Sequence, residues 1–393
     1  MTNIKITAQI IVDKLKAIVP DHRNHPLHEP QFTGNEWNYI KDCLDTGWVS
    51  SVGQYVDRFE RQLEEFTGIK HAIAVMNGTA ALHVSLRVAG VETDEEVLVP
   101  DLTFIATANA VTYCGAVPHF IDVEERTLGI DPKKLEAYLT EICSIQNGQC
   151  INNQTGRRVR ALIAMHTFGH PVDLDPVLEI CNRYNLILIE DAAESLGSYY
   201  KGMHTGHWGR MTALSFNGNK IVTTGGGGAV LTNDSLLAKE LKHVTTTAKL
   251  PHRWEFVHDQ AGYNYRLPNL NAALGCAQLE RLPEFLQHKR KIASIYQEAF
   301  HDVEGIRCFK EAEFAKSNYW LNALLLDDAD LDLRNALLEL SNDNGIMTRP
   351  AWMLMHKLPM FRSCPSMPAE IAEELTQRII NIPSSPYLGD AYA

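Results

Sequence analysis

The chain has 393 residues, 45% of them hydrophobic, so it is long enough to bury a large core and to form two or three domains. Its 36 basic and 48 acidic residues give a formal net charge of −12, and no basic run offsets it, so we expect no nucleic-acid or membrane partner. The 8 cysteines include no C-x-x-C pair, and several lie in apolar stretches such as VTYCGAV, which predicts reduced thiols in a cytoplasmic protein.

The N-terminal stretch MTNIKITAQIIVDKLKAIVP carries apolar residues at a spacing typical of an amphipathic helix. Asp13, Lys14 and Lys16 interrupt these residues and exclude the apolar segment of a signal peptide. No apolar run in the chain approaches the roughly 20 residues needed to span a bilayer. We therefore expect residues 1–30 to form a helical extension of a soluble protein.

Between about residue 70 and residue 235, short apolar runs alternate with helix-length segments. The runs are HAIAVM, EVLVP, VPHFID, RALIAM, LILIED, TALSF and GAVLT. This alternation predicts a mainly parallel sheet with helices on both faces, a three-layer αβα domain over residues 31–284. Such a sheet places its site at the carboxyl ends of the strands. The polar stretch SIQNGQCINNQTGRR is predicted to be an exposed loop.

After about residue 285 the sequence changes to a charged amphipathic helix, HKRKIASIYQEAF, followed by YWLNALLL and LRNALLEL. A proline-rich tail begins at Arg349. This pattern predicts a second, smaller α/β domain over residues 285–393.

Asp191 stands at the end of the apolar run LILIED. A buried carboxylate is costly unless it faces a cation or hydrogen-bond donors. Asp191 therefore either caps the following turn or pairs with the protonated ring nitrogen of pyridoxal phosphate.

Lys220 lies in the stretch SFNGNKIVTTGGGG, where the glycines follow the lysine. The order is the reverse of a nucleotide-binding P-loop, which places its glycines before the lysine. Lys220 is either a solvated surface residue or, beside a strand end, a desolvated nucleophile able to form a Schiff base. Ser215 could then offer a hydroxyl to a phosphate, and residues 225–228 would let the backbone turn away.

Two further segments suit the same chemistry. MNGTAALHVSL places Gly78 and Thr79 at a helix start, where backbone N–H groups favour a phosphate, although this pair often merely caps a helix. PDLTFIATANA places Phe104 after a strand, where it could stack on a pyridine ring or serve as an ordinary core residue.

The ordered motifs Gly78-Thr79, PDLTFIAT, EDAAESLG, SFNGNK and GYNYRLPNLNAALGCAQL resemble the DegT/DnrJ/EryC1/StrS family of nucleotide-sugar aminotransferases. The resemblance runs from about Gln31 to Tyr387. It implies a fold-type I enzyme that uses pyridoxal 5′-phosphate, with pyridoxamine phosphate as the intermediate and no metal.

Carried over residue by residue, the resemblance implies that Lys220 binds the cofactor covalently and shuttles a proton, and that Asp191 keeps the ring nitrogen protonated. Phe104 would stack on the ring, and Glu194 would lie near the ring hydroxyl. Asn264 matches a residue that reaches the phosphate in the neighbouring subunit, which implies a homodimer with shared sites.

The resemblance also assigns the phosphate to Gly78, Thr79 and Ser215. Arg349, Trp352 and His356 match a segment that lines the sugar or amino-donor side, with a structural ion pair as the alternative for Arg349. His166 would approach the cofactor, and the alternative is a satisfied histidine at a strand end.

The segments NHPLHEPQFTGNEW, GWVSSVGQYVDRFE and SFNGNKIVTTGGGG resemble enzymes of the routes to bacillosamine and legionaminic acid. They imply transfer of an amino group from L-glutamate to a UDP-linked 4-keto-6-deoxy-N-acetylhexosamine. The alternative is a perosamine-type enzyme acting on a GDP-linked 4-ketosugar. The presence of Lys220 disfavours a sugar 3-dehydratase, and the complete cofactor set disfavours a non-catalytic regulator. GHWGRM departs from the family pattern at His207 and Arg210.

Overall fold

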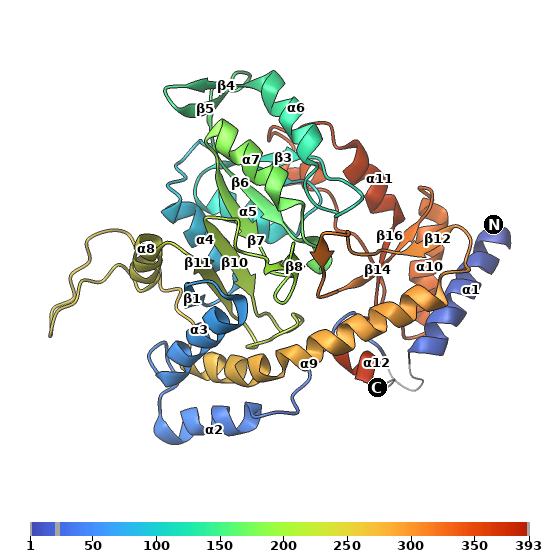
Figure 1. Cartoon of the computed structure of the whole chain (residues 1–393), viewed down its shortest axis with the longest axis horizontal. Coiled ribbons are helices and arrows are strands. Elements are labelled where there is room, and N and C mark those ends of the chain that lie inside the picture. The colour runs from blue at the N-terminus through green and yellow to red at the C-terminus, as the bar shows by residue number, and fades with distance from the viewer. Residues whose placement is uncertain (1, 20–23, 391–393) are drawn as a thin grey trace.

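The computed structural model describes residues 2–19 and 24–390, so parts of the predicted N-terminal extension and the end of the predicted small domain lie outside the described residues. Figure 1 shows a large sheet flanked by helices, a smaller sheet at the other end of the molecule, and the long helix α9 (Asn269–Ala299) running along both. The predicted N-terminal helix is present as α1 (Thr2–Ile18).

The large sheet contains all seven predicted strands and confirms the predicted α/β fold class. Along the main path the strand order is β1-β11-β10-β7-β6-β2-β3. The bounds are β1 His71–Val75, β2 Glu96–Pro100, β3 Val117–Ile121, β6 Arg158–Met165, β7 Ile187–Asp191, β10 Met211–Ser215 and β11 Gly228–Thr232. Adjacent strands from β10 to β3 pair in parallel, whereas β11 runs antiparallel to both of its neighbours.

Helices cover both faces of this sheet because its strands bury apolar side chains on both sides. One face packs on α4 (Gly78–Val88), α5 (Ile105–Tyr113) and α8 (Ser235–Thr245). The other face packs on α3 (Gln54–Thr67), α6 (Pro132–Ile142), α7 (Leu174–Tyr184) and the first half of α9. The strands and helices of the second, smaller unit are β12 Ile306–Cys308, β14 Asn322–Leu326, β15 Arg349–Pro350, β16 Ile379–Ile382, α10 Leu331–Asp343, α11 Glu370–Arg378 and α12 Pro386–Asp390.

Helix α9 joins the two units. Leu282 and Phe285 pack in the core of the large sheet, and Ile292 and Tyr296 pack with the small sheet and α1. The predicted domain boundary after residue 284 therefore falls inside a continuous helix, at the place where its packing partners change. The division into domains stays a prediction.

The polar stretch predicted as an exposed loop instead forms the hairpin of β4 (Cys143–Gln146) and β5 (Gln149–Asn152), which extends the sheet through β6. Its turn residues Asn147 and Gly148 have φ values of 51° and 76°. Asn-Gly is the sequence that a two-residue hairpin turn of this kind prefers, because both positions require positive φ. The stretch was predicted to be a loop from its polar composition, although its Asn-Gly pair indicates a hairpin turn.

The remaining short elements are α2 Glu36–Thr46, β8 Tyr199–Tyr200, β9 Met203–His204, β13 Ala315–Lys316 and the 3-10 turns Thr167–Gly169, Met355–Lys357 and Pro359–Phe361. No helix within the described residues is long and apolar enough to cross a membrane. The eight cysteines are free thiols, as predicted, and all but Cys308 and Cys364 are buried.

Candidate active site

A cavity of about 780 Å³ lies at the carboxyl ends of β7 and β10, between the large sheet and the small unit. Nine of the predicted site residues line it: Gly78, Thr79, Phe104, Asp191, Glu194, Ser215, Lys220, Arg349 and Trp352. The parallel strands account for this convergence, because segments far apart in sequence end at the same edge of the sheet.

The side chain of Lys220 is only 13% exposed, and its Nζ lies 3.3 Å from Oε1 of Glu194. The same nitrogen lies 3.9 Å from the centroid of the Trp320 ring. Trp320 in turn donates its ring N–H to the backbone oxygen of Asn219 at 2.9 Å, which connects the small unit to the loop that carries Lys220. The amine is therefore held between a carboxylate and an aromatic face rather than in bulk solvent.

Asp191 ends β7 and is 3% exposed. Its carboxylate accepts hydrogen bonds from the hydroxyl of Thr107 at 2.7 Å and from the backbone N–H of Ala193 at 3.2 Å. Burial raises the pKa of Asp191 despite these two donors, so a cation placed in the cavity beside it would stabilise the charged form.

Glu194 lies one turn beyond Asp191 and is also buried. Its Oε2 accepts the backbone N–H of Phe168 at 2.8 Å, and its Oε1 faces Lys220. Burial raises the pKa of Glu194 to about 7, and the charge of Lys220 opposes this rise. The two carboxylates of this segment therefore differ in surroundings, since Glu194 faces an amine and Asp191 faces neutral donors.

The N-terminus of α4 also lines the cavity, beside the end of β10. Asn77 caps this helix by accepting the N–H of Ala80 at 2.7 Å. A Cβ added to Gly78 would lie 2.9 Å from Cβ of Ser215, so the helix start and the end of β10 approach as closely as they do because Gly78 has no side chain. Backbone donors and a hydroxyl thus meet at a helix N-terminus, which is an arrangement that favours phosphate.

Comparison with known proteins identifies this arrangement. Residues 30–393 match the family described as the DegT/DnrJ/EryC1/StrS aminotransferase family. The chain belongs to this family. It is a pyridoxal-phosphate-dependent sugar aminotransferase, as predicted.

Several named relatives are similar over nearly the whole length of this aminotransferase. The GDP-perosamine synthase of Escherichia coli O157:H7 is 38% identical, covering 93% of this chain and 94% of its own. The GDP-perosamine synthase of Caulobacter vibrioides is 36% identical, and the match covers 92% of this chain and 93% of that protein. Among solved structures, a DegT DnrJ EryC1 StrS aminotransferase from Brucella abortus is 28% identical, with a TM-score of 0.81 over 91% of this chain and 92% of its own.

The residues that meet in the cavity of the aminotransferase fit pyridoxal phosphate. The pyridine nitrogen of the cofactor needs an acidic partner, and Asp191 is a buried carboxylate that a cation would stabilise. Its aldehyde needs an amine, which Lys220 provides. Its phosphate suits the N-terminus of α4 beside Ser215.

Trp352 and Arg349, which were predicted for the substrate side, line the cavity, and that role stays a prediction. The Trp352 ring lies between Phe104 and Phe168, at centroid distances of 6.2 Å and 5.0 Å. Arg349 is exposed and donates to Asn342 Oδ1 at 2.9 Å and to the backbone oxygen of Thr348 at 2.8 Å. Within the described part of the chain no carboxylate pairs with it, which removes the structural ion pair as its explanation.

His166 and His356 do not line the cavity of this chain, and their predicted roles stay predictions. The His166 Nε2 lies 3.0 Å from Glu190, and its Nδ1 accepts the N–H of Val172 at 3.2 Å. These contacts match the alternative interpretation of His166, a histidine at a strand end whose hydrogen bonds are satisfied within the protein. His356 is held by Asp101, through its backbone N–H at 2.9 Å and its ring at 2.5 Å.

Asn264 is exposed and does not line the cavity of its own chain. A backbone bridge pairs it with Thr246 in the segment between α8 and α9. Its predicted role lies in a neighbouring subunit, so it stays a prediction.

The sequence reasoning missed several cavity residues, among them His28, Trp320 and Asn219. Thr107 lies behind the wall and was missed as the donor to Asp191. Trp320 belongs to an apolar run with no signal beyond its hydrophobicity. Thr107 lies inside PDLTFIAT, so its hydroxyl three residues after Phe104 was the available signal.

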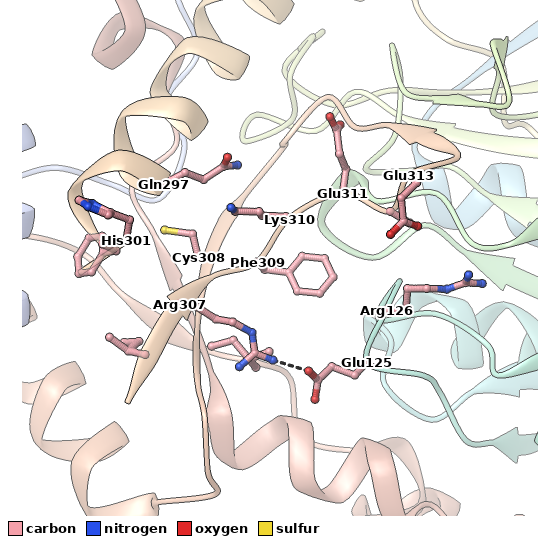
Figure 2. A pocket seen from close by; sticks show the side chains of 14 residues that line it. Glu125, Arg126, Gln297, His301, Arg307, Cys308, Phe309, Lys310, Glu311 and Glu313 are labelled. Carbon is pink, nitrogen blue, oxygen red and sulfur yellow. Dashed lines mark hydrogen bonds and ion pairs between the residues drawn. The ribbon is translucent and has the colours of Figure 1, made fainter. Parts of the chain in front are cut away.

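A second cavity, of about 710 Å³, lies at the junction of β12, the end of α9 and the loop near Glu125. Figure 2 shows charged side chains around it, with Arg307 paired to Glu125. Arg307 also pairs with Asp327 at 2.8 Å, and Arg126 pairs with Asp173 at 2.6 Å. These charges neutralise one another, so the geometry favours the first cavity as the active site.

Proposed function

We propose that the protein transfers the amino group of L-glutamate to the keto carbon of a nucleotide-linked 4-keto-6-deoxyhexose, and that the nucleotide is GDP. The observation that carries this proposal is the similarity to GDP-perosamine synthases, three of which are 34–38% identical over 92–93% of the chain. The relatives thus favour the alternative of the sequence analysis over its main prediction of a UDP-linked N-acetylhexosamine.

The UDP-linked sugar is kept as a second candidate because of where two sequence segments lie. The stretches NHPLHEPQFTGNEW and SFNGNKIVTTGGGG resemble the enzymes of UDP-linked sugars. They contribute Pro26, Leu27, His28, Asn217, Asn219 and Lys220 to the cavity wall. Some of these residues can contact a substrate as well as the cofactor, so this resemblance bears on specificity.

The geometry of the cavity residues supports a role for each of them in this proposal. Pyridoxal phosphate, when bound, supplies an electrophilic carbon and a ring that withdraws electrons. Lys220 Nζ would take the proton from the substrate carbon and deliver it to the cofactor carbon, because Lys220 is the amine in the cavity wall at the strand ends. Asp191 holds the proton on the ring nitrogen, and Phe104 stacks on the ring.

Glu194 keeps the Lys220 amine in place through their 3.3 Å contact and lies near the ring hydroxyl. Gly78, Thr79 and Ser215 bind the phosphate. Arg349 binds the carboxylate of glutamate, because this arginine lines the cavity and its hydrogen-bond partners within the described chain are neutral oxygens of Asn342 and Thr348.

We also propose a homodimer with shared sites. The segment after α8 extends from the body of the fold (Figure 1) and exposes 68% of Trp254 and 77% of Phe256. Large exposed apolar side chains on one segment indicate a protein contact. Asn264 lies on the same segment, and a neighbouring subunit that covers Trp254 and Phe256 would receive Asn264 at its own phosphate site.

A substrate panel tests the proposed function. Purified enzyme with glutamate is given GDP- and dTDP-linked 4-keto-6-deoxyhexoses and a UDP-linked 4-keto-6-deoxy-N-acetylhexosamine, and 2-oxoglutarate formation is followed. We expect turnover of the GDP-linked sugar to exceed that of the others by at least about tenfold, equivalent to about 1.4 kcal/mol. Preference for the UDP-linked N-acetyl sugar would select the second candidate, and no turnover of any sugar would reject both.

A further inference from the structure

The segment around His28 forms one wall of the cavity because the small unit holds its backbone. His25 donates its N–H to Gly345 at 2.8 Å, and Met347 donates to the backbone oxygen of His25 at 2.9 Å. The N–H of Ser384 binds the backbone oxygen of Leu27 at 2.7 Å. This pairing places Pro26, Leu27 and His28 along the cavity opposite the strand ends.

The His28 ring is 7% exposed, and neither ring nitrogen makes a hydrogen bond of ordinary geometry within the described residues, although the backbone of Asn219 faces the ring. A buried polar group without a partner destabilises a folded protein, so such groups are rare and require an explanation. Because His28 lines the cavity, a ligand in that cavity can supply the missing partners.

The surroundings of His28 keep its ring neutral. Burial and the positive charges of Lys289 and Lys220 hold the pKa of His28 well below its usual value, and the backbone of Asn219 offsets this only in part. Lys289 is itself fully buried and donates to the backbone oxygens of Trp320 at 3.0 Å and Ser384 at 2.5 Å. A neutral imidazole offers one donor and one acceptor.

We propose that His28 is a specificity residue for the sugar half of the reaction and hydrogen-bonds a hydroxyl group of the hexose through a ring nitrogen. A hydroxyl both donates and accepts, as a neutral imidazole does, whereas carboxylates and phosphates need donors only. The proposal rests on the proposed function, because it requires a nucleotide-linked hexose in this cavity.

The test compares the two half-reactions in the holoenzyme, each followed by the visible absorbance of the cofactor. His28→Leu removes both ring nitrogens, and His28→Asn keeps a donor and an acceptor. We expect His28→Leu to lower the efficiency of the ketosugar half-reaction by roughly tenfold or more, with the glutamate half-reaction changed by less than about twofold. His28→Asn should restore most of the loss.

Calorimetric binding of the nucleotide-linked amino sugar gives a second readout, and His28→Leu should weaken it by a similar factor. His170→Leu is the matched control, because His170 is a buried histidine with an unpartnered Nδ1 that lies outside the cavity. In this control the ratio of the efficiencies of the sugar and glutamate half-reactions should equal that of the wild type.

An unchanged sugar half-reaction in His28→Leu would overturn the proposal. Equal loss of both half-reactions would also overturn it, since that result assigns His28 to the cofactor site or to the fold. Failure of the wild-type enzyme on every ketosugar in the panel is a different result, because it rejects the proposed function before any variant is compared.

Discussion

Asp191 and Glu194 are buried carboxylates three residues apart, and the groups around each of them differ. Thr107 and Ala193 donate to Asp191, which leaves its charge uncompensated by any cation within hydrogen-bond reach in the described chain. Glu194 faces the Lys220 amine at 3.3 Å. The first carboxylate therefore suits a cationic ring nitrogen, and the second suits the positioning of an amine.

Replacing Asp191 by Asn should lower kcat on the order of 100-fold or more, because an amide cannot stabilise a protonated ring nitrogen. Thr107→Val removes only the hydroxyl that orients Asp191 and should cost less, roughly tenfold or below. Steady-state kinetics on both variants measures the difference. A fully active Asp191→Asn enzyme would contradict the assigned role.

Glu194→Gln should change the pH dependence of stability in cofactor-free protein. Burial raises the pKa of Glu194 from 4.5 to about 7, so its ionised form is disfavoured in the folded state. The stability of the wild type is then fully present below pH 4.5 and is reduced as the pH rises through 7, whereas Gln does not ionise. The Tm of the variant relative to wild type should rise by up to a few degrees between pH 5 and pH 8. A constant difference would be inconsistent with this explanation.

Site residues that come directly after a predicted strand could be identified from the sequence. Asp191 and Lys220 each follow an apolar run, and the parallel sheet brings them together. The pairing of His166 with Glu190 was not predictable in the same way, because the partner is fixed by tertiary packing rather than by local sequence. His28 and Trp320 were missed for the same reason, since both come from the small unit's side of the cavity.

At the scale of elements, the N-terminus of α4 and the end of β10 approach each other through Gly78. Gly78→Ala would place a Cβ 2.9 Å from Ser215 and force one of the two elements to move. We expect the affinity of cofactor-free protein for pyridoxal phosphate to fall by about tenfold or more, measured by absorbance titration.

Gly218→Ala is the matched control, because a Cβ at Gly218 meets no atom within 4 Å. This variant should bind the cofactor as the wild type does. Equal affinities for Gly78→Ala and Gly218→Ala would show that the close approach does not shape the phosphate site.

The strands of the large sheet were predictable because they are short apolar runs between helix-length segments. The β4 and β5 hairpin was not recognised, because each strand is only four residues long and polar side chains such as Gln146 and Gln149 interrupt its apolar residues. Their pairing depends on the turn residues and on the adjacent strand β6. Composition alone does not report either contribution.

At the scale of the whole molecule, the segment between α8 and α9 exposes apolar side chains that the proposed dimer would cover. Trp254→Ser combined with Phe256→Ser should shift the protein from dimer to monomer at micromolar concentration, measured by light scattering after size exclusion. Activity should fall with dimer content. Unchanged dimer content would place the interface elsewhere.

The shared site has its own test in mixed dimers. One chain carries Asn264→Ala and the other carries Lys220→Ala, so each dimer contains one site lacking the amine and one site that keeps it. If Asn264 acts across the interface, the site with the intact Lys220 receives an intact Asn264 from its neighbour and works normally. Activity no higher than that of the Asn264→Ala homodimer would show that Asn264 acts within its own chain.

The central claim is that Lys220 forms the covalent bond to pyridoxal phosphate. Borohydride reduction of the holoenzyme followed by peptide mass spectrometry tests it directly. We predict that the peptide containing Lys220 gains the mass of one reduced cofactor and that Lys220→Ala protein shows no such gain. Unmodified protein after reduction, or a cofactor attached to a different lysine, would contradict the account.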